Sequence, residues 1–493
     1  MNHWLIVPIL LPLFTGGLLL TGYRAANHKK RWLAIVCTWA LVPLAAYLVW
    51  LADDGVLRNY QLGNWQAPFG ISLLLDRLSA VMLLVTALLA SACVYFAKHE
   101  DQQAPNFYGL FQFQLLGING AFLTADLFNL FVFFEILLIA SYALLVYGNH
   151  ANKVRAGISY VILNLVGSSL FLIGIGILYG LLGTLSLSEL SIRISQASSE
   201  QASLLAAAGF CLLLVFALKA AVLPLNFWLP HTYSVANASI AALFAIMTKV
   251  GLYAIVRVFT LLFGSEANEL AHFALPLLWW LALATIALAA IGALAAKNLS
   301  VLTSYLVLVS VGTLLAGLSL GTAPALTASL YYLAHSTLAT GAMFLLAGLV
   351  SKVRGDNGFE VGNAFKQPLL LGALFFFIAI AMAGLPPLSG FNGKVMLLKA
   401  AHTESGWLLW PILLLASFMV IVALVRAGSV LFRQKHECQN TASIGAKEVL
   451  PILMLLLPVL ILVIAAELVV NYLNMTSLQL LNLAPYWQVG GVQ

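Results

Sequence analysis

Charged side chains are scarce in this sequence of 493 residues. Asp, Glu, Lys and Arg make up 8% of the chain and hydrophobic residues 62%, against roughly 25% and 45–50% in soluble domains. This imbalance excludes a water-soluble fold. Apolar runs of about 20 residues, the length that one helix needs to cross a bilayer, recur from Trp4 to Val470 with short polar breaks. We count about fourteen such runs.

Cysteine is also rare, and the usual motifs of cofactor chemistry are missing. The four cysteines are Cys37, Cys93, Cys211 and Cys438, none of them in a CxxC pair, which argues against a disulfide framework, a thiolate metal site or an iron–sulfur cluster. The chain has no Walker loop, no GxGxxG after a strand and no HExxH. We therefore expect no cofactor and no metal, and redox chemistry would have to come from a partner.

The runs lack the residue-by-residue alternation of a membrane barrel, and lipid cannot satisfy an open strand edge, so they are predicted to be helices. The fold class is thus an all-α polytopic membrane protein.

The net charge of +6 reflects the orientation of the chain in the membrane rather than nucleic-acid binding. Alternate loops collect basic residues such as Lys30, Lys153, Lys297, Lys352 and Lys447. The other side keeps Arg58, Arg77, Arg193 and Arg257. The positive-inside rule then places the chain in a bacterial inner membrane with both termini outside.

Two of the apolar runs are interrupted by proline. In the seventh run, Lys219 is followed by the segment from Pro224 to His231, in which PLNFWLP has a proline at each end. In the twelfth run, Pro386 and Pro387 precede Lys394. Proline removes a helix hydrogen bond and clashes with the preceding turn, so both helices should unwind within the membrane. Paired interruptions in the two halves of a transporter point to its ion path. The alternative is that these prolines only kink their helices.

Ionisable side chains interrupt otherwise apolar helices at five positions. Their burial in hydrocarbon costs roughly 2.5–3.5 kcal/mol each on insertion scales, so such groups are usually functional. They are Glu135, Lys219, Lys249, His335 and Lys394.

We expect Glu135 to be the counter-charge of Lys219. If Glu135 moves away, Lys219 should release its proton toward Lys249, since an unpaired buried lysine disfavours its charged form. His335 is suited to pass protons on to Lys394.

Each of these residues has a structural alternative. Glu135 and Lys219 would then be an ion pair that pins two helices, His335 a packing residue, and Lys394 a side chain that extends to the membrane surface. His231 would serve an exit route or cap unwound backbone. Asp76 and Asp126 are placed near membrane edges, where a charge is less costly.

A short pattern occurs twice, as Ser159-Tyr160 with Gly167-Ser168 and as Ser304-Tyr305 with Gly312-Thr313. The two helices enter the membrane from the same side, so the pattern cannot relate inverted repeats. We interpret it as a coincidence of helix packing.

The sequence resembles the antiporter-like membrane subunits shared by Mrp-type cation/proton antiporters, respiratory complex I and membrane-bound hydrogenases. The resemblance lies in Glu135 of the fifth span, KAAVLPLNFWLPH from Lys219, IAALFAIMTKVGLYAIVR from Ile240, His335, and GLPPLSGFNGK up to Lys394. It implies fourteen helices, two inverted five-helix repeats and broken helices seven and twelve. It also implies that the five ionisable residues form the proton pathway.

The resemblance divides the chain into helices one to three (1–106), a first repeat (107–263), a second repeat (272–432) and a last helix with its tail (433–493). Lys394 in place of a glutamate, and the length without a long C-terminal amphipathic helix, look most like the D subunit of Mrp-type antiporters. One position departs from the family pattern: Thr340 stands where relatives often carry a second lysine after the histidine.

The function expected from the resemblance is proton translocation in a multisubunit Na⁺ or K⁺/H⁺ antiporter. The chain would be a transporter subunit in a hetero-oligomer within the lipid bilayer, and not an enzyme. Two alternatives remain: a proton-pumping subunit of an NADH:quinone oxidoreductase or hydrogenase-type complex, and a scaffold without an ion path. The sequence does not identify the cation.

Overall fold

A computed structural model gives the fold and describes residues 3–21, 27–65, 70–100, 106–147, 151–360, 365–401, 406–433 and 444–489. Cys438 lies outside these ranges. The first part of the chain forms η1 (His3–Leu5), α1 (Val7–Thr21), α2 (Asn27–Ala52), β1 (Arg58–Gln61), η2 (Leu62–Asn64), β2 (Ser72–Leu75) and α3 (Arg77–Glu100).

The elements that follow are helical. The first half continues with α4 (Phe107–Leu123), α5 (Leu127–Val146), α6 (Ala151–Leu182), α7 (Leu187–Ser195), α8 (Ser199–Ala220), α9 (Trp228–Val235), α10 (Ala238–Phe244) and α11 (Met247–Leu261). The second half contains η3 (Asn268–Leu270), α12 (Leu275–Ala295), α13 (Leu299–Ser319), α14 (Ala323–Arg354), α15 (Pro368–Ala383), α16 (Ser389–Ala400), α17 (Gly406–Gly428) and the π-helix η4 (Ser429–Arg433). The chain ends with α18 (Ala446–Ile464), α19 (Ala466–Leu481) and α20 (Ala484–Val489).

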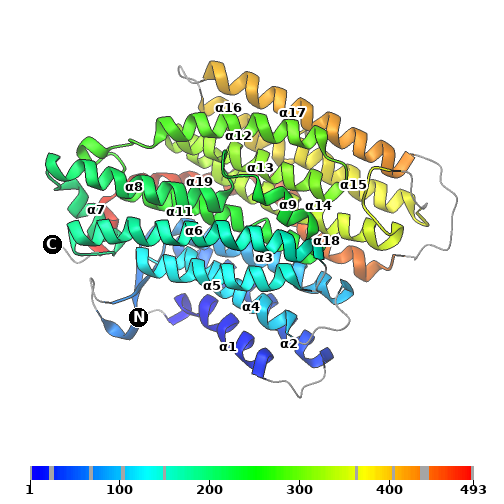
Figure 1. The fold of residues 1–493 in the computed structure, drawn as a ribbon, viewed down its shortest axis with the longest axis horizontal. Coiled ribbons are helices and arrows are strands. Elements are labelled where there is room, and N and C mark those ends of the chain that lie inside the picture. The colour runs from blue at the N-terminus through cyan, green and yellow to red at the C-terminus, as the bar shows by residue number, and fades with distance from the viewer. Residues whose placement is uncertain are drawn as a thin grey trace.

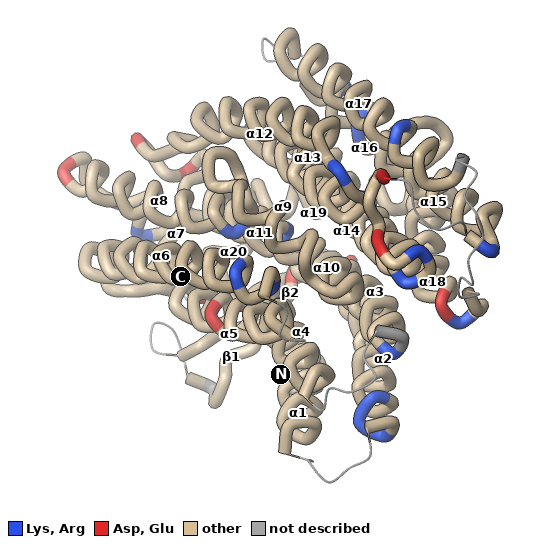
Figure 2. The backbone as a smooth tube through the Cα atoms, turned by 45° about the vertical axis from the view of Figure 1, so that its right-hand side comes forward, with Lys and Arg blue, Asp and Glu red and all other residues tan. Residues whose placement is uncertain are grey.

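The long helices lie side by side in one bundle, and both termini lie at the same end of it (Figure 1). Among the described residues, 11 helices are long and apolar enough to cross a membrane, and α1 and α15 are shorter apolar helices. The all-α membrane fold is therefore confirmed, whereas the count of fourteen spans stays a prediction. Figure 2 shows how few charged positions the backbone carries; α1, α12 and α13 have none.

The two halves repeat one local pattern on opposite sides of the bundle. Asp126 caps α5 by accepting a hydrogen bond from the Asn129 N–H, and Asn298 caps α13 in the same way. Each cap residue also forms a backbone bridge to a loop further along, Asp126 with Ser186 after α6 and Asn298 with Gly358 after α14. The first loop lies at the end that holds the termini, which we call the terminus side, and the second lies at the opposite side. This local pattern thus occurs in inverted orientation, and the division into two five-helix repeats stays a prediction.

Both predicted interruptions are present. The helix α8 is followed by Ala221, whose φ of 58° is left-handed, and α15 is followed by Gly384 with φ of 76°. In the first break, Trp228 Nε1 donates to the Leu218 carbonyl and Thr285 Oγ1 accepts from the Leu223 N–H. These side chains satisfy backbone groups that lipid could not.

A third interruption was not predicted. The sequence suggests one helix across residues 238–263, but the structure divides it into α10 and α11. The Tyr233 hydroxyl donates to the Phe244 carbonyl at 2.8 Å, at the residue where α10 ends. A side chain that takes a carbonyl from the helix ladder interrupts the helix there. The result places Lys249 in the first turn of α11.

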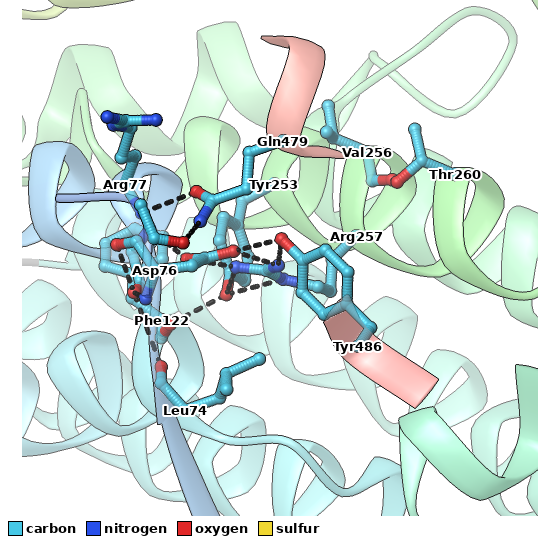
Figure 3. A network of polar contacts seen from close by, with 12 residues as sticks. Leu74, Asp76, Arg77, Phe122, Tyr253, Val256, Arg257, Thr260, Gln479 and Tyr486 are labelled. Carbon is cyan, nitrogen blue, oxygen red and sulfur yellow. Dashed lines mark hydrogen bonds and ion pairs between the residues drawn. The ribbon is translucent and has the colours of Figure 1, made fainter. Parts of the chain in front are cut away.

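Asp76 directly precedes α3 and is fully buried within the protein. Arg257 of α11 donates two hydrogen bonds, of 2.5 and 2.8 Å, to the Asp76 carboxylate (Figure 3). The Tyr486 hydroxyl of α20 donates to the same carboxylate at 2.7 Å, and Tyr253 accepts from Arg257. This cluster ties α3, α11 and the C-terminal segment together on the terminus side.

Candidate functional site

Glu135 and Lys219 are connected through α6 rather than paired directly. The Ser168 hydroxyl donates to Glu135 Oε1, and Lys219 Nζ donates to Asn164 Oδ1 at 3.0 Å. Ser168 and Asn164 lie one turn apart on α6, and the Asn164 backbone carbonyl, 3.0 Å from Ser168 Oγ, is an alternative acceptor for the single Ser168 hydroxyl proton. Among the described residues no ion pair joins Glu135 and Lys219. Both side chains therefore contact α6 rather than each other, and the counter-charge role of Glu135 stays a prediction.

Lys219 lies against a small cavity that opens toward the helix of Lys249. Its ammonium is 5.9 Å from the centre of the Phe134 ring and its side chain is buried. The cavity, about 10 Å³, is also lined by Met247 and Val250, the residues on either side of the Thr248-Lys249 pair. This volume is at the lower limit of the roughly 10–15 Å³ that one water molecule needs, and the cavity contacts Lys219 but not Lys249.

Lys249 has no ion-pair partner among the residues that the structure describes. It is completely buried, and its Nζ donates to Ser310 Oγ of α13 at 3.1 Å. A neutral hydroxyl compensates a buried ammonium less than an ion pair does, so Lys249 is held without a counter-charge from the described residues.

In the second half, His335 and Lys394 meet at the second break. His335 Nδ1 lies 2.8 Å from Ser389 Oγ, at the start of α16. Lys394 Nζ donates to the Ala383 carbonyl at 2.8 Å and to Ser417 Oγ of α17 at 2.9 Å. Lys394 is buried and does not extend to the membrane surface. Both side chains are thus held at unwound backbone.

The prolines of the two breaks and His231 are exposed, whereas Thr340 is buried. Pro224, Pro386 and Pro387 are in the unwound segments but are exposed, so they shape the breaks without facing the lysines. His231 on α9 is exposed as well. Thr340 is buried, and its Oγ1 makes no hydrogen bond with any residue that the structure describes.

Two cavities approach the buried residues from opposite ends. A cavity of about 530 Å³ on the opposite side lies between α10 and α14 and is lined by Asn237, Ala241, Phe344 and Gly348. A cavity of about 230 Å³ on the terminus side adjoins a smaller one through Val256, Leu318 and Leu326. The smaller cavity reaches Ser329 and Leu333, close in the chain to His335.

The sequence analysis passed over the polar partners of the ionisable residues. These are Asn164, Ser168, Ser310, Ser389 and Ser417. Ser168 belongs to the repeated pattern interpreted as coincidence. The available signal was an isolated polar residue in an apolar helix, but small hydroxyl residues are common in membrane helices and bond to their own backbone, so the signal is weak.

Gly390 is predicted to be essential for the second break. A Cβ at this position would overlap the Ala381 carbonyl oxygen and lie 2.7 Å from His335 Nε2. We expect Gly390→Ala to displace α16 or His335 and to destabilise the protein by about 1–3 kcal/mol.

The melting temperature of the purified assembly in detergent measures this effect. Gly176→Ala is the control, because a Cβ there would meet no atom within 4 Å. Equal melting temperatures for the two variants would contradict the close approach at Gly390.

A family model, curated relatives and a solved structure all point to the same family. The model described as "NADH:quinone oxidoreductase/Mrp antiporter, TM" matches residues 124–420. The D subunit of the Na(+)/H(+) antiporter of Bacillus subtilis (strain 168) is 38% identical over 432 residues, 86% of each chain. The D subunit of a probable K(+)/H(+) antiporter of Rhizobium meliloti (strain 1021) is 37% identical over 518 residues, covering 98% of this chain and 96% of the relative. A chain of the Mrp complex from Dietzia sp. DQ12-45-1b has the same fold, with a TM-score of 0.88 at 24% identity over 99% of this chain and 100% of that one.

Proposed function

This chain belongs to the NADH:quinone oxidoreductase/Mrp antiporter transmembrane family, and we propose that it is the proton-translocating subunit of a multisubunit monovalent cation/proton antiporter. It would act as a secondary transporter subunit in a hetero-oligomer, not as a catalytic enzyme. The relatives named as antiporter D subunits favour this function over a subunit of a redox-driven pump.

The observation that supports the proposal is a series of buried ionisable side chains that form no ion pair with any described residue. Lys219, Lys249, His335 and Lys394 are each more than nine-tenths buried. Each is hydrogen-bonded to a neutral oxygen of another segment. A structural role would favour paired charges, since an unpaired buried charge is strongly destabilising. Groups that gain and lose a proton avoid that cost in one of their two states.

Glu135 is the group that would control this series. It is only partly buried on α5, and a single described hydroxyl holds it. A shift of its carboxylate relative to α6 would change the field at Lys219 and hence its hold on the proton. The proton would then move to Lys249 and through His335 to Lys394. The two cavities would provide access from the two sides of the membrane.

The cation and the orientation belong to the proposal as well. The two D-subunit relatives are named for Na⁺ and for K⁺ exchange, and we propose that this chain carries the proton while Na⁺ or K⁺ is exchanged by the assembly. The excess of Lys and Arg on the opposite side supports a bacterial cell membrane location with both termini outside.

The test is Na⁺- and K⁺-dependent proton flux in inverted vesicles that contain the complete complex. We expect Glu135→Gln and Lys394→Ala to lower this flux by on the order of 100-fold while the complex still assembles. Assembly is quantified by co-purification of the other subunits from the same vesicles. Normal flux in both variants would reject the proton pathway and leave a scaffold role.

A further inference from the structure

Asn164 of α6 is the residue that holds the Lys219 ammonium in the described part of the chain. Its side chain is buried, and its Oδ1 accepts a hydrogen bond of 3.0 Å from Lys219 Nζ. No other described residue accepts a hydrogen bond from this ammonium, so the position of Asn164 decides where the Lys219 proton lies.

Two neighbours fix the orientation of the Asn164 amide. Its Nδ2 donates to the Tyr160 carbonyl, one turn earlier on α6, at 2.8 Å. A carbonyl only accepts hydrogen bonds and an ammonium only donates them, so Tyr160 and Lys219 require the same placement of the amide nitrogen and oxygen. The reverse orientation would lose both hydrogen bonds. The amide oxygen is therefore directed at Lys219.

The helix α6 also keeps Lys219 and Glu135 apart. Ser168, one turn after Asn164, donates to Glu135 Oε1. Side chains one turn apart on a helix have Cβ atoms about 5–6 Å apart, so the carboxylate and the ammonium have separate partners along one helix face. Asn164 thus competes with Glu135 for the ammonium.

The ammonium that Asn164 holds lies at the small cavity described above. Asn164 and Lys219 both line this cavity, and Met247 and Val250 of α11 line it as well. The next lysine of the proposed pathway, Lys249, belongs to α11. In this arrangement the Lys219 proton faces α11 and is not paired with Glu135.

We propose that Asn164 is a positioning residue that keeps the Lys219 ammonium away from Glu135 and at the cavity lined by α11. This inference rests on the proposed function and adds a control on its first proton transfer. Without the Asn164 oxygen, Lys219 would pair with Glu135, and a lysine paired with a carboxylate keeps its proton.

Asn164→Leu and Asn119→Leu form a matched pair for the test. Each replaces a buried amide in an apolar helix by a side chain of similar size. Asn119 of α4 donates its hydrogen bond of 2.8 Å to the Pro8 carbonyl of α1 rather than to an ionisable side chain. In vesicles with the complete complex, we expect Asn164→Leu to lower cation-dependent proton flux at least about tenfold, as for a misplaced reacting group, and Asn119→Leu to keep it.

Asn164→Asp distinguishes positioning from packing, and it serves as the second variant if Asn164→Leu assembles poorly. Aspartate has nearly the shape of asparagine and can accept the same hydrogen bond, so packing around Lys219 is kept. Its carboxylate favours the charged lysine, so Lys219 should release its proton only at higher pH. We expect lower flux at neutral pH and a pH of maximum flux that shifts upward. The titratable groups around Lys219, which are Glu135, Tyr160 and Lys249, stay in place in this variant.

Flux at the wild-type level with an unshifted pH profile, in whichever Asn164 variant assembles, would overturn the proposal. A lower flux in Asn164→Asp with an unshifted pH of maximum flux would also overturn it, since that result indicates a packing role.

Lys219→Met, measured beside them, separates the positioning role from the proposed function. Loss of flux in Lys219→Met with normal flux in the Asn164 variants rejects the positioning role alone. Normal flux in Lys219→Met rejects the proton pathway and the positioning role with it.

Discussion

Replacing Lys219 with methionine is expected to reduce cation-dependent proton flux by on the order of 100-fold or more, the effect of losing a group that carries the proton. Methionine has a similar length and fills the space against Phe134, so packing is preserved. Asn164 Oδ1 loses the hydrogen bond that Lys219 donates, but α8 and the first break stay intact. Flux in inverted vesicles with the complete complex is the measurement.

Lys399→Met is the control for this change. Lys399 lies on α16 close to Lys394, yet its side chain is exposed, and it takes no part in the buried series. The same substitution there should leave flux unchanged. If Lys219→Met and Lys399→Met behave alike while both complexes assemble, Lys219 is not a proton carrier.

Asp76→Asn is expected to produce the largest loss of stability, about 3–5 kcal/mol, because it leaves the Arg257 guanidinium buried without its counter-charge. Burial by itself would raise the pKa of Asp76, but Arg257, the Ser79 N–H and the Tyr486 hydroxyl hold that pKa below its usual value. The carboxylate therefore contributes stability at neutral pH that is lost only as the pH falls through its lowered pKa.

The melting temperature of the assembly in detergent measures this effect, and the double variant Asp76→Leu/Arg257→Leu is the informative comparison. Removing both charges takes away the uncompensated one, so the double variant should be more stable than Asp76→Asn. A melting temperature of Asp76→Asn equal to that of the wild type would show that the pair does not hold α3, α11 and α20 together.

How far the sequence predicts the site differs between residues. Glu135, Lys219, Lys249, His335 and Lys394 can be found from sequence because a charge inside an apolar run is costly wherever the helix packs. Their hydrogen-bond partners cannot be found from sequence. Ser168 or Ser310 looks like any small polar residue until a second helix brings a charged group beside it. The pairing of Asp76 with Arg257 could not be predicted for the same reason, because the two residues lie 181 positions apart in the chain.

The sequence by itself determined the membrane environment, the helical class and the two proline breaks, because these depend on local properties: apolar length, backbone hydrogen bonding and the missing N–H of proline. Only the tertiary structure decided that α6 contacts both Glu135 and Lys219, that Tyr233 interrupts the helix before Lys249, and that Ser389 meets His335. Hydrogen bonds of this kind act over about 3 Å between residues far apart in the chain, so they exist only once the helices have packed.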